Sequence, residues 1–204
     1  MSDYTTQEQQ ASYGIGLQMG EQLASNPFDG LEISAVSAGI ADAFAGAESK
    51  VSQADLQAAF QVISERMQAA AAEQAKVLGA AGEEFLAENA KKEGVVVTES
   101  GLQYEVIAEG EGDKATAEST VSVHYHGSLI DGTVFDSSVE RGQPAEFPVG
   151  GVIAGWTEAL QLMSPGGKMK LAIPADLAYG ERGAGAAIGP HATLVFEVEL
   201  LAIK

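Results

Sequence analysis

The chain has 204 residues, which is long enough for one or two domains with a substantial core, and it contains no cysteine. Its 29 acidic and 11 basic residues give a formal net charge of −18 at pH 7. Nucleic acids and anionic membrane surfaces are bound through clustered Lys and Arg, so this balance argues against both as main partners. The absence of cysteine excludes thiol catalysis and disulfide bonds.

The first residues of the chain carry neither a basic stretch nor an apolar run. Residues 1–8 read MSDYTTQE, so no signal peptide is predicted. No segment approaches the roughly 20 consecutive apolar residues that a membrane span requires. With Met1 taken as the start, we expect a cytoplasmic protein with no membrane partner.

Two short helices are expected before residue 48. The first carries apolar side chains on several faces, and its Gly16 and Gly20 are spaced so that another helix could approach closely. The turn signal DG at residues 29–30 separates it from a second helix with one apolar stripe. Two short helices cannot bury such faces alone, so residues 1–48 are predicted to form a homodimerisation domain. The side chains expected in the dimer interface are Ile15, Leu17, Met19, Leu23, Val36, Ile40 and Phe44.

A long helix is expected over residues 52–93. Ser52 followed by Asp55 has the pattern of an N-cap with an acidic residue in the first turn. The middle of the helix, residues 68–76, is almost entirely Ala and polar, which predicts an exposed strut between packed ends. Residues 49–94 are therefore predicted to be a linker helix.

Glycines mark two features of this linker helix. Gly79 and Gly82 each cost about 1 kcal/mol relative to Ala, so they are the expected position of a bend. Gly94 fits the position just after a helix end.

From residue 101 onward apolar and polar positions alternate, which is the period of half-buried antiparallel strands. The clearest examples are residues 168–173 (KMKLAI) and 194–200 (LVFEVEL). Residues 156–163 read as one short helix that ends at a proline and two glycines. A sheet wrapped on one helix is an α+β fold, so residues 95–204 are predicted to be one α+β domain after the helical arm.

Several short motifs follow one another along this half of the chain. They are residues 123–127 (VHYHG), 135–138 (FDSS), 152–156 (VIAGW), 178–180 (AYG) and 192–196 (ATLVF). In this order and at about this spacing they resemble the FKBP-type peptidyl-prolyl cis-trans isomerase family. The helical arm, with ASYGIG at residues 11–16, resembles the dimeric bacterial subgroup that includes the macrophage infectivity potentiator proteins. The resemblance implies an enzyme of protein folding that isomerises Xaa-Pro bonds in unfolded or partly folded proteins, without a cofactor.

The resemblance assigns the pocket of that family to particular residues. Catalytic roles are implied for Tyr125, Phe135, Asp136, Tyr179 and Phe196. Substrate-binding roles are implied for Arg141, Phe147, Val152, Ile153, Trp156 and Ile188. Trp156 would form the floor under the proline ring, while the Tyr179 hydroxyl and the Ile153 backbone N–H would donate hydrogen bonds to substrate carbonyl oxygens. The macrolides tacrolimus and rapamycin are implied as inhibitors, although Ala145 replaces an aromatic residue that many relatives carry.

A pocket without a nucleophile can still catalyse this reaction. Rotation about a peptide bond costs about 18–20 kcal/mol because resonance is lost in the twisted state. The planar amide is the more dipolar form, so an apolar pocket that excludes water favours the twist when binding energy holds the proline in place. Ser137 and Ser138 have no evident His or Asp partner, so serine hydrolysis is not expected. His124 and His126 share one strand face, but no third ligand is evident and no metal site is predicted.

Other interpretations stay open. Trp156 and Tyr125 could be core residues, Asp136 could form a local turn, and Tyr179 could anchor a loop. The alternative function is a holdase-like chaperone that recognises proline-containing clients without turnover, which the long arm favours.

Overall fold

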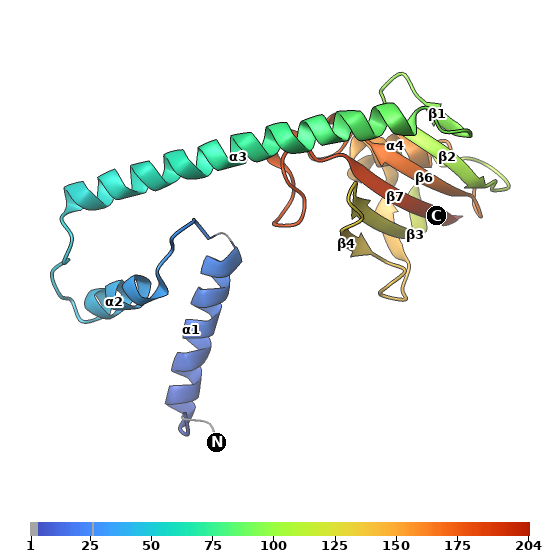
Figure 1. Ribbon diagram of the computed structural model, residues 1–204. Coiled ribbons are helices and arrows are strands. Elements are labelled where there is room, and N and C mark those ends of the chain that lie inside the picture. The colour runs from blue at the N-terminus through green and yellow to red at the C-terminus, as the bar shows by residue number, and fades with distance from the viewer. Residues whose placement is uncertain (1–3, 26) are drawn as a thin grey trace. The chain divides into compact units, whose positions relative to one another are not determined.

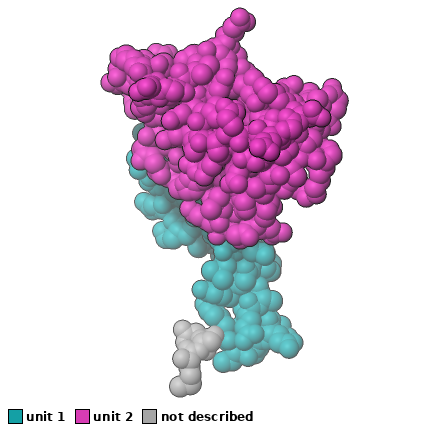
Figure 2. All heavy atoms as spheres, turned by 90° about the vertical axis from the view of Figure 1, so that its right-hand side faces the viewer, with its two compact units in different colours: residues 1–70 teal, residues 71–204 magenta. Residues whose placement is uncertain are grey.

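The computed structural model describes residues 4–25 and 27–204. Two compact units divide the chain, residues 1–70 (unit 1) and residues 71–204 (unit 2), as Figure 2 colours them. The division falls inside the long helix α3 (Gln53–Asn89). The division into domains at residues 48 and 94 stays a prediction.

Unit 1 contains α1 (Gln7–Ser25), α2 (Ile33–Phe44) and the first part of α3. Neither α1 nor α2 has a buried residue. The apolar side chains of both helices face solvent, and Phe44 is 95% exposed. Since apolar surface of this kind is costly to leave in water, the helices of unit 1 lack a core within a single chain.

The predicted start of α3 is confirmed, and its predicted end is wrong. Ser52 Oγ accepts the backbone N–H of Asp55 at 3.2 Å and donates to Asp55 Oδ2 at 2.7 Å, which caps the helix. The helix ends at Asn89, before the predicted end at residue 93. The N–H groups of Lys91 and Lys92 bond to carbonyls only three residues back, so the chain tightens there before Gly94 takes a φ of 84°.

Unit 2 is built on one antiparallel sheet with the strand order β1-β2-β6-β7-β3-β4, in which β5 also pairs with β3 (Figure 1). Its strands are β1 (Val95–Val97), β2 (Gln103–Ala108), β3 (Thr120–Leu129), β4 (Val134–Ser137), β5 (Ala145–Pro148), β6 (Lys168–Ile173) and β7 (Leu194–Ile203). The remaining elements are η1 (Val149–Gly151), α4 (Ala154–Leu160), η2 (Ala175–Leu177) and η3 (Gly180–Arg182). The predicted α+β class is confirmed.

The short helix α4 packs on β6. A Cβ at Gly155 would lie 2.5 Å from Ile173 Cγ2, so only glycine lets the helix approach this closely. Trp156 and Leu160 on the same helix are buried in the core. The sequence predicted a helix over residues 156–163, and both of these bounds are wrong. The helix α4 starts at Ala154 and ends at Leu160. After it, the N–H of Met163 bonds to the carbonyl of Leu160, three residues back.

The second half of α3 packs against the loop before β7. Gly82 is the only buried residue of α3, and a Cβ there would meet Thr193 Oγ1 at 2.4 Å. A Cβ at Gly79 would lie 3.6 Å from the His191 Cβ. The helix continues unbroken through both glycines, and the bend at Gly79 and Gly82 stays a prediction. At Gly82 the helix backbone lies against Thr193, in the loop before β7.

Side-chain hydrogen bonds fix the end of α3 to β2. Gln103, which is buried, accepts a hydrogen bond at Oε1 from Asn89 Nδ2 at 2.9 Å and donates from Nε2 to the carbonyl of Leu86 at 2.9 Å. Because both ends of this buried amide are satisfied, the contact orients the helix without leaving a polar group unpaired.

The two glycines of α3 give a matched pair of substitutions. We expect Gly79→Ala to stabilise unit 2 by up to about 1 kcal/mol, because it gains helix propensity and meets only ordinary contact. Gly82→Ala gains the same propensity but forces Thr193 to move, and overpacking costs about 1–3 kcal/mol. Gly82→Ala should therefore be less stable than Gly79→Ala by about that amount. Trp156 is the only tryptophan, so its fluorescence during urea unfolding reports on unit 2. Equal stability of the two variants would contradict the contact at Gly82.

Candidate active site

One cleft in unit 2 brings together the predicted pocket residues. It has a volume of about 610 Å³ and draws its lining from β3, β4, β5, α4, the loops on either side of η3, and β7. The lining residues are Tyr125, Phe135, Asp136, Phe147, Gly151, Val152, Ile153, Trp156, Tyr179, Ile188 and Phe196. Every predicted site residue except Arg141 is among them, and Arg141 contacts two of them. Gly151 was not predicted, since a glycine at the end of η1 carries no chemical signal of its own.

The floor of the cleft is a cluster of aromatic rings around Trp156, which is 4% exposed. Its ring centroid lies 5.3 Å from that of Tyr125, 5.8 Å from Phe147 and 5.2 Å from Phe196, each close to edge-on. Edge-to-face packing at these distances is favourable because the edge of one ring is positive and the face of the next is negative. The Trp156 Nε1–H has no hydrogen-bond partner among the described residues. The cluster is therefore aromatic throughout, with this N–H as a buried donor left unpaired by the described residues.

Gly127 is a residue that the sequence did not single out for the pocket. A Cβ there would lie 2.7 Å from the ring of Phe196 and 2.8 Å from that of Phe135. These two rings meet edge to face with centroids 5.4 Å apart. Glycine in the middle of β3 thus makes the space in which the two aromatic walls converge. The VHYHG motif contains Gly127, but the reason for a glycine there is its contact with Phe135 and Phe196, which come later in the sequence.

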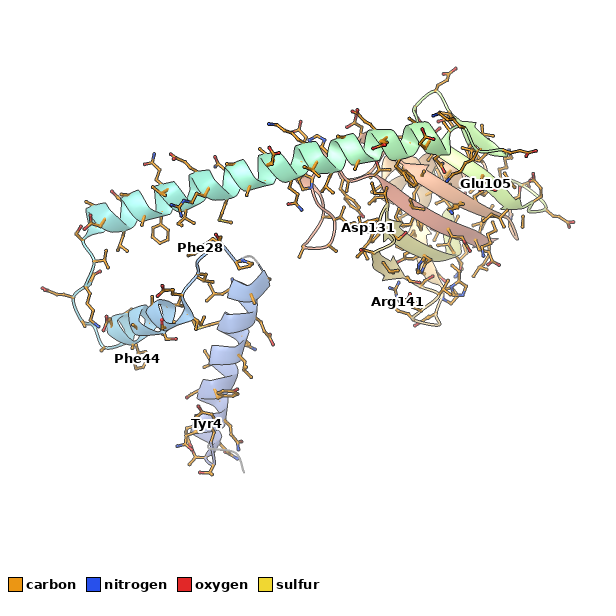
Figure 3. The ribbon with its side chains drawn as sticks, in the orientation of Figure 1. Tyr4, Phe28, Phe44, Glu105, Asp131 and Arg141 are labelled. Carbon is orange, nitrogen blue, oxygen red and sulfur yellow. The ribbon has the colours of Figure 1, made fainter. Side chains whose placement is uncertain are left out.

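One wall of the cleft is polar and charged. The Tyr125 hydroxyl donates to Asp136 Oδ2, and Arg141 Nη1 forms an ion pair with Asp136 Oδ1. Arg141 Nη2 also donates to the Tyr125 hydroxyl oxygen at 3.0 Å, and the guanidinium lies 5.7 Å from the centre of the Tyr125 ring. Figure 3 labels Arg141, which lies on the chain between β4 and β5. The three side chains form a closed triangle that fixes the Tyr125 ring.

This triangle shifts the pKa of its members. Burial works to raise the pKa of Asp136, but hydrogen bonds from Tyr125 and Arg141 and the charge of Arg141 outweigh it, so the pKa falls below its ordinary value. The pKa of Tyr125 is raised, first by burial and then by its hydrogen bond to the Asp136 carboxylate. Tyr125 therefore stays a protonated donor and Asp136 an ionised acceptor at neutral pH.

Ser137 and Ser138 do have histidine partners, contrary to prediction. Ser138 Oγ lies 3.1 Å from His124 Nδ1, and Ser137 Oγ lies 3.1 Å from His126 Nδ1. Both serine side chains are buried, and Ser138 Oγ accepts the backbone N–H of Tyr125 at 2.8 Å. The serines thus hold the backbone of Tyr125 and do not face the cleft as nucleophiles. No group of three or more potential metal ligands occurs among residues 4–25 and 27–204.

Two hydrogen-bond donors at the rim of the cleft have no acceptor among the described residues. The Tyr179 side chain is 41% exposed, and its hydroxyl makes no hydrogen bond to another described residue. The backbone N–H of Ile153 also has no acceptor in the part of the chain that the structure describes, while its carbonyl accepts from Trp156 and Thr157 at the start of α4. These are the two donors that the resemblance implied for substrate carbonyl oxygens.

The chain matches known proteins over most of its length. Residues 111–201 match the FKBP-type peptidyl-prolyl cis-trans isomerase family, and residues 8–106 match the domain amino terminal to that isomerase. The chain belongs to the FKBP-type peptidyl-prolyl cis-trans isomerase family. It is 56% identical over 200 residues to the FKBP-type 22 kDa peptidyl-prolyl cis-trans isomerase of Escherichia coli strain K12, covering 98% of this chain and 97% of that protein.

Solved structures support the same assignment. The crystal structure of FkpA from Escherichia coli superimposes with a TM-score of 0.70 at 38% identity and covers 98% of both chains. A peptidyl-prolyl cis-trans isomerase from Pseudomonas syringae pv. tomato matches with a TM-score of 0.59 at 42% identity. It covers 63% of this chain and 95% of the solved chain. In this FKBP family member, none of the described helices is long and apolar enough to cross a membrane.

The triangle of Tyr125, Asp136 and Arg141 can be tested by titration. We expect the Asp136 carboxyl to titrate below the ordinary Asp pKa of about 3.9, and Tyr125→Phe to raise its pKa by removing a hydrogen bond. Carbon-detected NMR of the side-chain carboxyls measures both values. Asp131 is an internal control, because its lowered pKa comes from the Thr133 N–H and should not change in Tyr125→Phe. An Asp136 pKa that does not respond would contradict the hydrogen bond.

The sign of the effect on stability follows from the lowered pKa. Ionised Asp136 stabilises the fold above a pH of about 3.9, and this contribution is lost as the pH falls through the lower folded-state pKa. The Arg141 and Asp136 side chains are 52% and 42% exposed, so solvent screens the pair. Its contribution to the free energy of unfolding should therefore be small.

Proposed function

We propose that this FKBP family member isomerises Xaa-Pro bonds in the aromatic cleft of unit 2. The observation that carries the proposal is the buried ring cluster around Trp156 next to two free donors, the Tyr179 hydroxyl and the Ile153 N–H. A proline ring is apolar and fits a dry aromatic floor, whereas the flanking carbonyl oxygens need donors at the rim. No covalent step is required.

The cleft lowers the barrier by treating the planar and twisted amides differently. In water, the dipolar planar amide is well solvated, and twisting it costs about 18–20 kcal/mol. Phe135, Phe196 and Trp156 replace that water with apolar surface, so the planar form loses solvation that the less dipolar twisted form does not need. Donation from Ile153 and Tyr179 to the flanking carbonyl oxygens holds the chain while the bond turns. Binding energy at these flanking groups is thereby used to favour the transition state.

The polar wall has a positioning role and a direct one. Asp136 and Arg141 hold the Tyr125 ring through its hydroxyl, which keeps the aromatic wall in place. The Asp136 carboxylate also lines the cleft, so a bound substrate chain would lie beside it. Because its pKa is lowered, the carboxylate keeps its charge throughout the neutral range.

Substitutions in the cleft should separate these roles. Tyr179→Phe removes one hydrogen bond, worth about 0.5–1.5 kcal/mol, and should lower kcat/KM about 2- to 10-fold. Asp136→Ala removes charge-assisted bonds worth about 1.5–3 kcal/mol and should lower it about 10- to 100-fold. A protease-coupled or NMR exchange assay on proline peptides measures these rates.

Tyr104→Phe is the matched control for Tyr179→Phe, because Tyr104 packs against the core from β2 and does not line the cleft. It should leave the rate unchanged, and Trp156 fluorescence should show that all three variants keep the fold. The proposal would be contradicted if the unmodified chain did not accelerate the isomerisation of proline peptides.

Unit 1 favours a second role, in assembly and in client binding. A hollow of about 910 Å³ runs along α1 and is lined by Tyr13, Gly16, Leu17 and Gly20 among others. The two glycines have open space where a Cβ would lie, so a helix of a second copy could approach there. We infer a two-fold homodimer joined through the α1 and α2 faces, which would bury these apolar side chains. A holdase-like chaperone that binds clients on the same arm remains the alternative, because exposed apolar surface suits either partner.

A chain reduced to residues 71–204 should keep the isomerase and lose the assembly. Among the described residues, every buried one lies in unit 2, so unit 2 has its own core. We expect light scattering to give twice the 21.0 kDa chain mass for the full protein and a monomer for residues 71–204. Turnover of proline peptides should be equal in both, while refolding of a large protein client should be slower with the shortened chain.

Point substitutions on α1 test the interface in the full-length chain, as a control for the chain reduced to residues 71–204. Leu17→Glu places a charge in the hollow and should favour the monomer, whereas Gln18→Glu adds the same charge outside its lining and should not. If Leu17→Glu dimerises as tightly as Gln18→Glu, the α1 face is not the interface. Client refolding by the Leu17→Glu monomer at the unmodified rate would argue against a client role of the paired arm.

Macrolide binding and a cytoplasmic location stay predictions. Ala145, the position where many relatives carry an aromatic residue, pairs with Val123 and packs against the core without lining the cleft. Tacrolimus or rapamycin would therefore meet the aromatic cluster itself, and the alanine would act on them only through its neighbours on β5.

A further inference from the structure

A second groove lies beside the proline cleft within unit 2. Its volume is about 540 Å³, inside the range of about 300–1,000 Å³ that is usual for ligand sites. Three segments form its walls: Gln74, Leu78 and Ala81 on α3, residues 129–131 after β3, and the loop from Arg182 to Thr193. In Figure 1 the orange-red loop after η3 lies beside α3. The groove is separate from the aromatic cluster, and the isomerisation step described above does not use it.

Ile188 connects the two cavities, because it lines both the cleft and the groove. Its side chain is 7% exposed, and its backbone exchanges two hydrogen bonds with Ala184, at 2.8 and 3.1 Å. This residue is therefore a fixed partition between the cavities. A polypeptide with its proline on the Trp156 floor can continue past Ile188 into the groove.

The groove is preformed because glycines let its walls meet closely. A Cβ at Gly189 would lie 2.6 Å from Leu78 Cδ1 and 3.4 Å from Gln74 Nε2. Further along, the contact of Gly82 with Thr193 fixes the same loop to α3. A wall fixed in this way loses little conformational freedom when a ligand binds.

The lining suits an extended peptide with apolar side chains. Leu78, Leu129 and Ile130 provide apolar surface, and the loop between Gly185 and Pro190 adds only small residues and Ile188. Two charged groups line the same groove, Asp131 and Arg182. Asp131 Oδ1 already accepts the Thr133 N–H at 2.9 Å, whereas Arg182 forms no ion pair with any described residue. The guanidinium is thus free to donate to the carbonyl oxygens of a bound chain.

We propose that this groove is an accessory subsite for the apolar residues that flank the isomerised proline in a polypeptide substrate. The proposal rests on the proposed isomerase function, because continuity with the proline cleft is what selects the substrate chain as the occupant. It gives α3 a part in choosing substrates. The discrimination acts on binding and leaves the chemical step unchanged.

Two peptides with the same central residues around proline test the subsite in the full-length protein. One is extended at both ends by leucines and the other by serines. Burial of one leucine side chain in the groove should lower KM about tenfold for the leucine peptide, with kcat unchanged. Equal KM values for the two peptides would overturn the proposal.

Two aspartate substitutions locate the effect. Ala186→Asp brings a charge to the groove from an exposed loop position, and it should raise KM for the leucine peptide about tenfold while the serine peptide is unaffected. Ala80→Asp makes the same change on an exposed position of α3 outside the lining and should match the unmodified chain. A rise in KM for both peptides alike would overturn the proposal, since it would mean that the loop had distorted the cleft. So would a change in oligomeric mass with KM unaltered, because a second copy would then be the occupant.

NMR of the unmodified protein separates failure of the subsite from failure of the isomerase. The leucine peptide should shift the backbone amide signals of Leu78 and Ala187, and the serine peptide should shift only signals around the cleft. Absence of turnover with both peptides defeats the proposed function, whichever signals move. Normal turnover of both peptides, with the Leu78 and Ala187 signals unmoved, defeats the subsite alone.

Discussion

The edge-to-face packing of Trp156 beneath Tyr125, Phe147 and Phe196 is the interaction on which unit 2 depends. The rings come from α4 and three different strands, so the cluster ties the helix to the sheet while it also forms the floor of the cleft. Each such ring pair adds about 0.5–1.5 kcal/mol beyond the area it buries. The same aromatic rings therefore belong to the core and to the floor of the cleft. A mutation that loosens the core would loosen the site with it.

Glycines set how closely the parts of this structure approach one another. Gly155 lets α4 rest on Ile173, and Gly127 gives Phe135 and Phe196 the room to converge. Gly82 and Gly189 do the same between α3 and the loop that carries Ile188. Because a Cβ at any of these positions would come within 3.0 Å of a neighbour, each glycine contributes through its missing side chain. The second half of α3 thus packs on the rest of unit 2, to which it belongs.

The features that could be predicted from the sequence are those that follow from local residue patterns. The features that could not be predicted depend on contacts between residues far apart in the sequence. Alternation over residues 168–173 and 194–200 indicated β6 and β7. The family resemblance indicated the whole lining of the cleft except Gly151, although Phe147 and Ile188 lie outside the five motifs. The roles of Gly82 and Gly127 depend on Thr193 and Phe196, which are far away in sequence, so propensity alone suggested a bend at Gly82 instead. The partners of Ser137 and Ser138 were missed for a related reason, since only the pairing of β3 with β4 brings His124 and His126 beside them.

The distribution of charge bears on how such an acidic chain can bind polypeptides at all. With a net charge of −18, the average field repels acidic clients and does not favour carbonyl oxygens near the surface. Two arginines counter this field where substrate would lie. Arg141 stands against Tyr125 and Asp136 at the cleft, and Arg182 lines the groove. Arg141 is neutralised by Asp136, so its charge serves mainly to fix the wall, whereas Arg182 forms no ion pair with a described residue and keeps its full charge toward a ligand. The groove should therefore provide the electrostatic attraction for a substrate chain, whereas the cleft should select the proline by its shape.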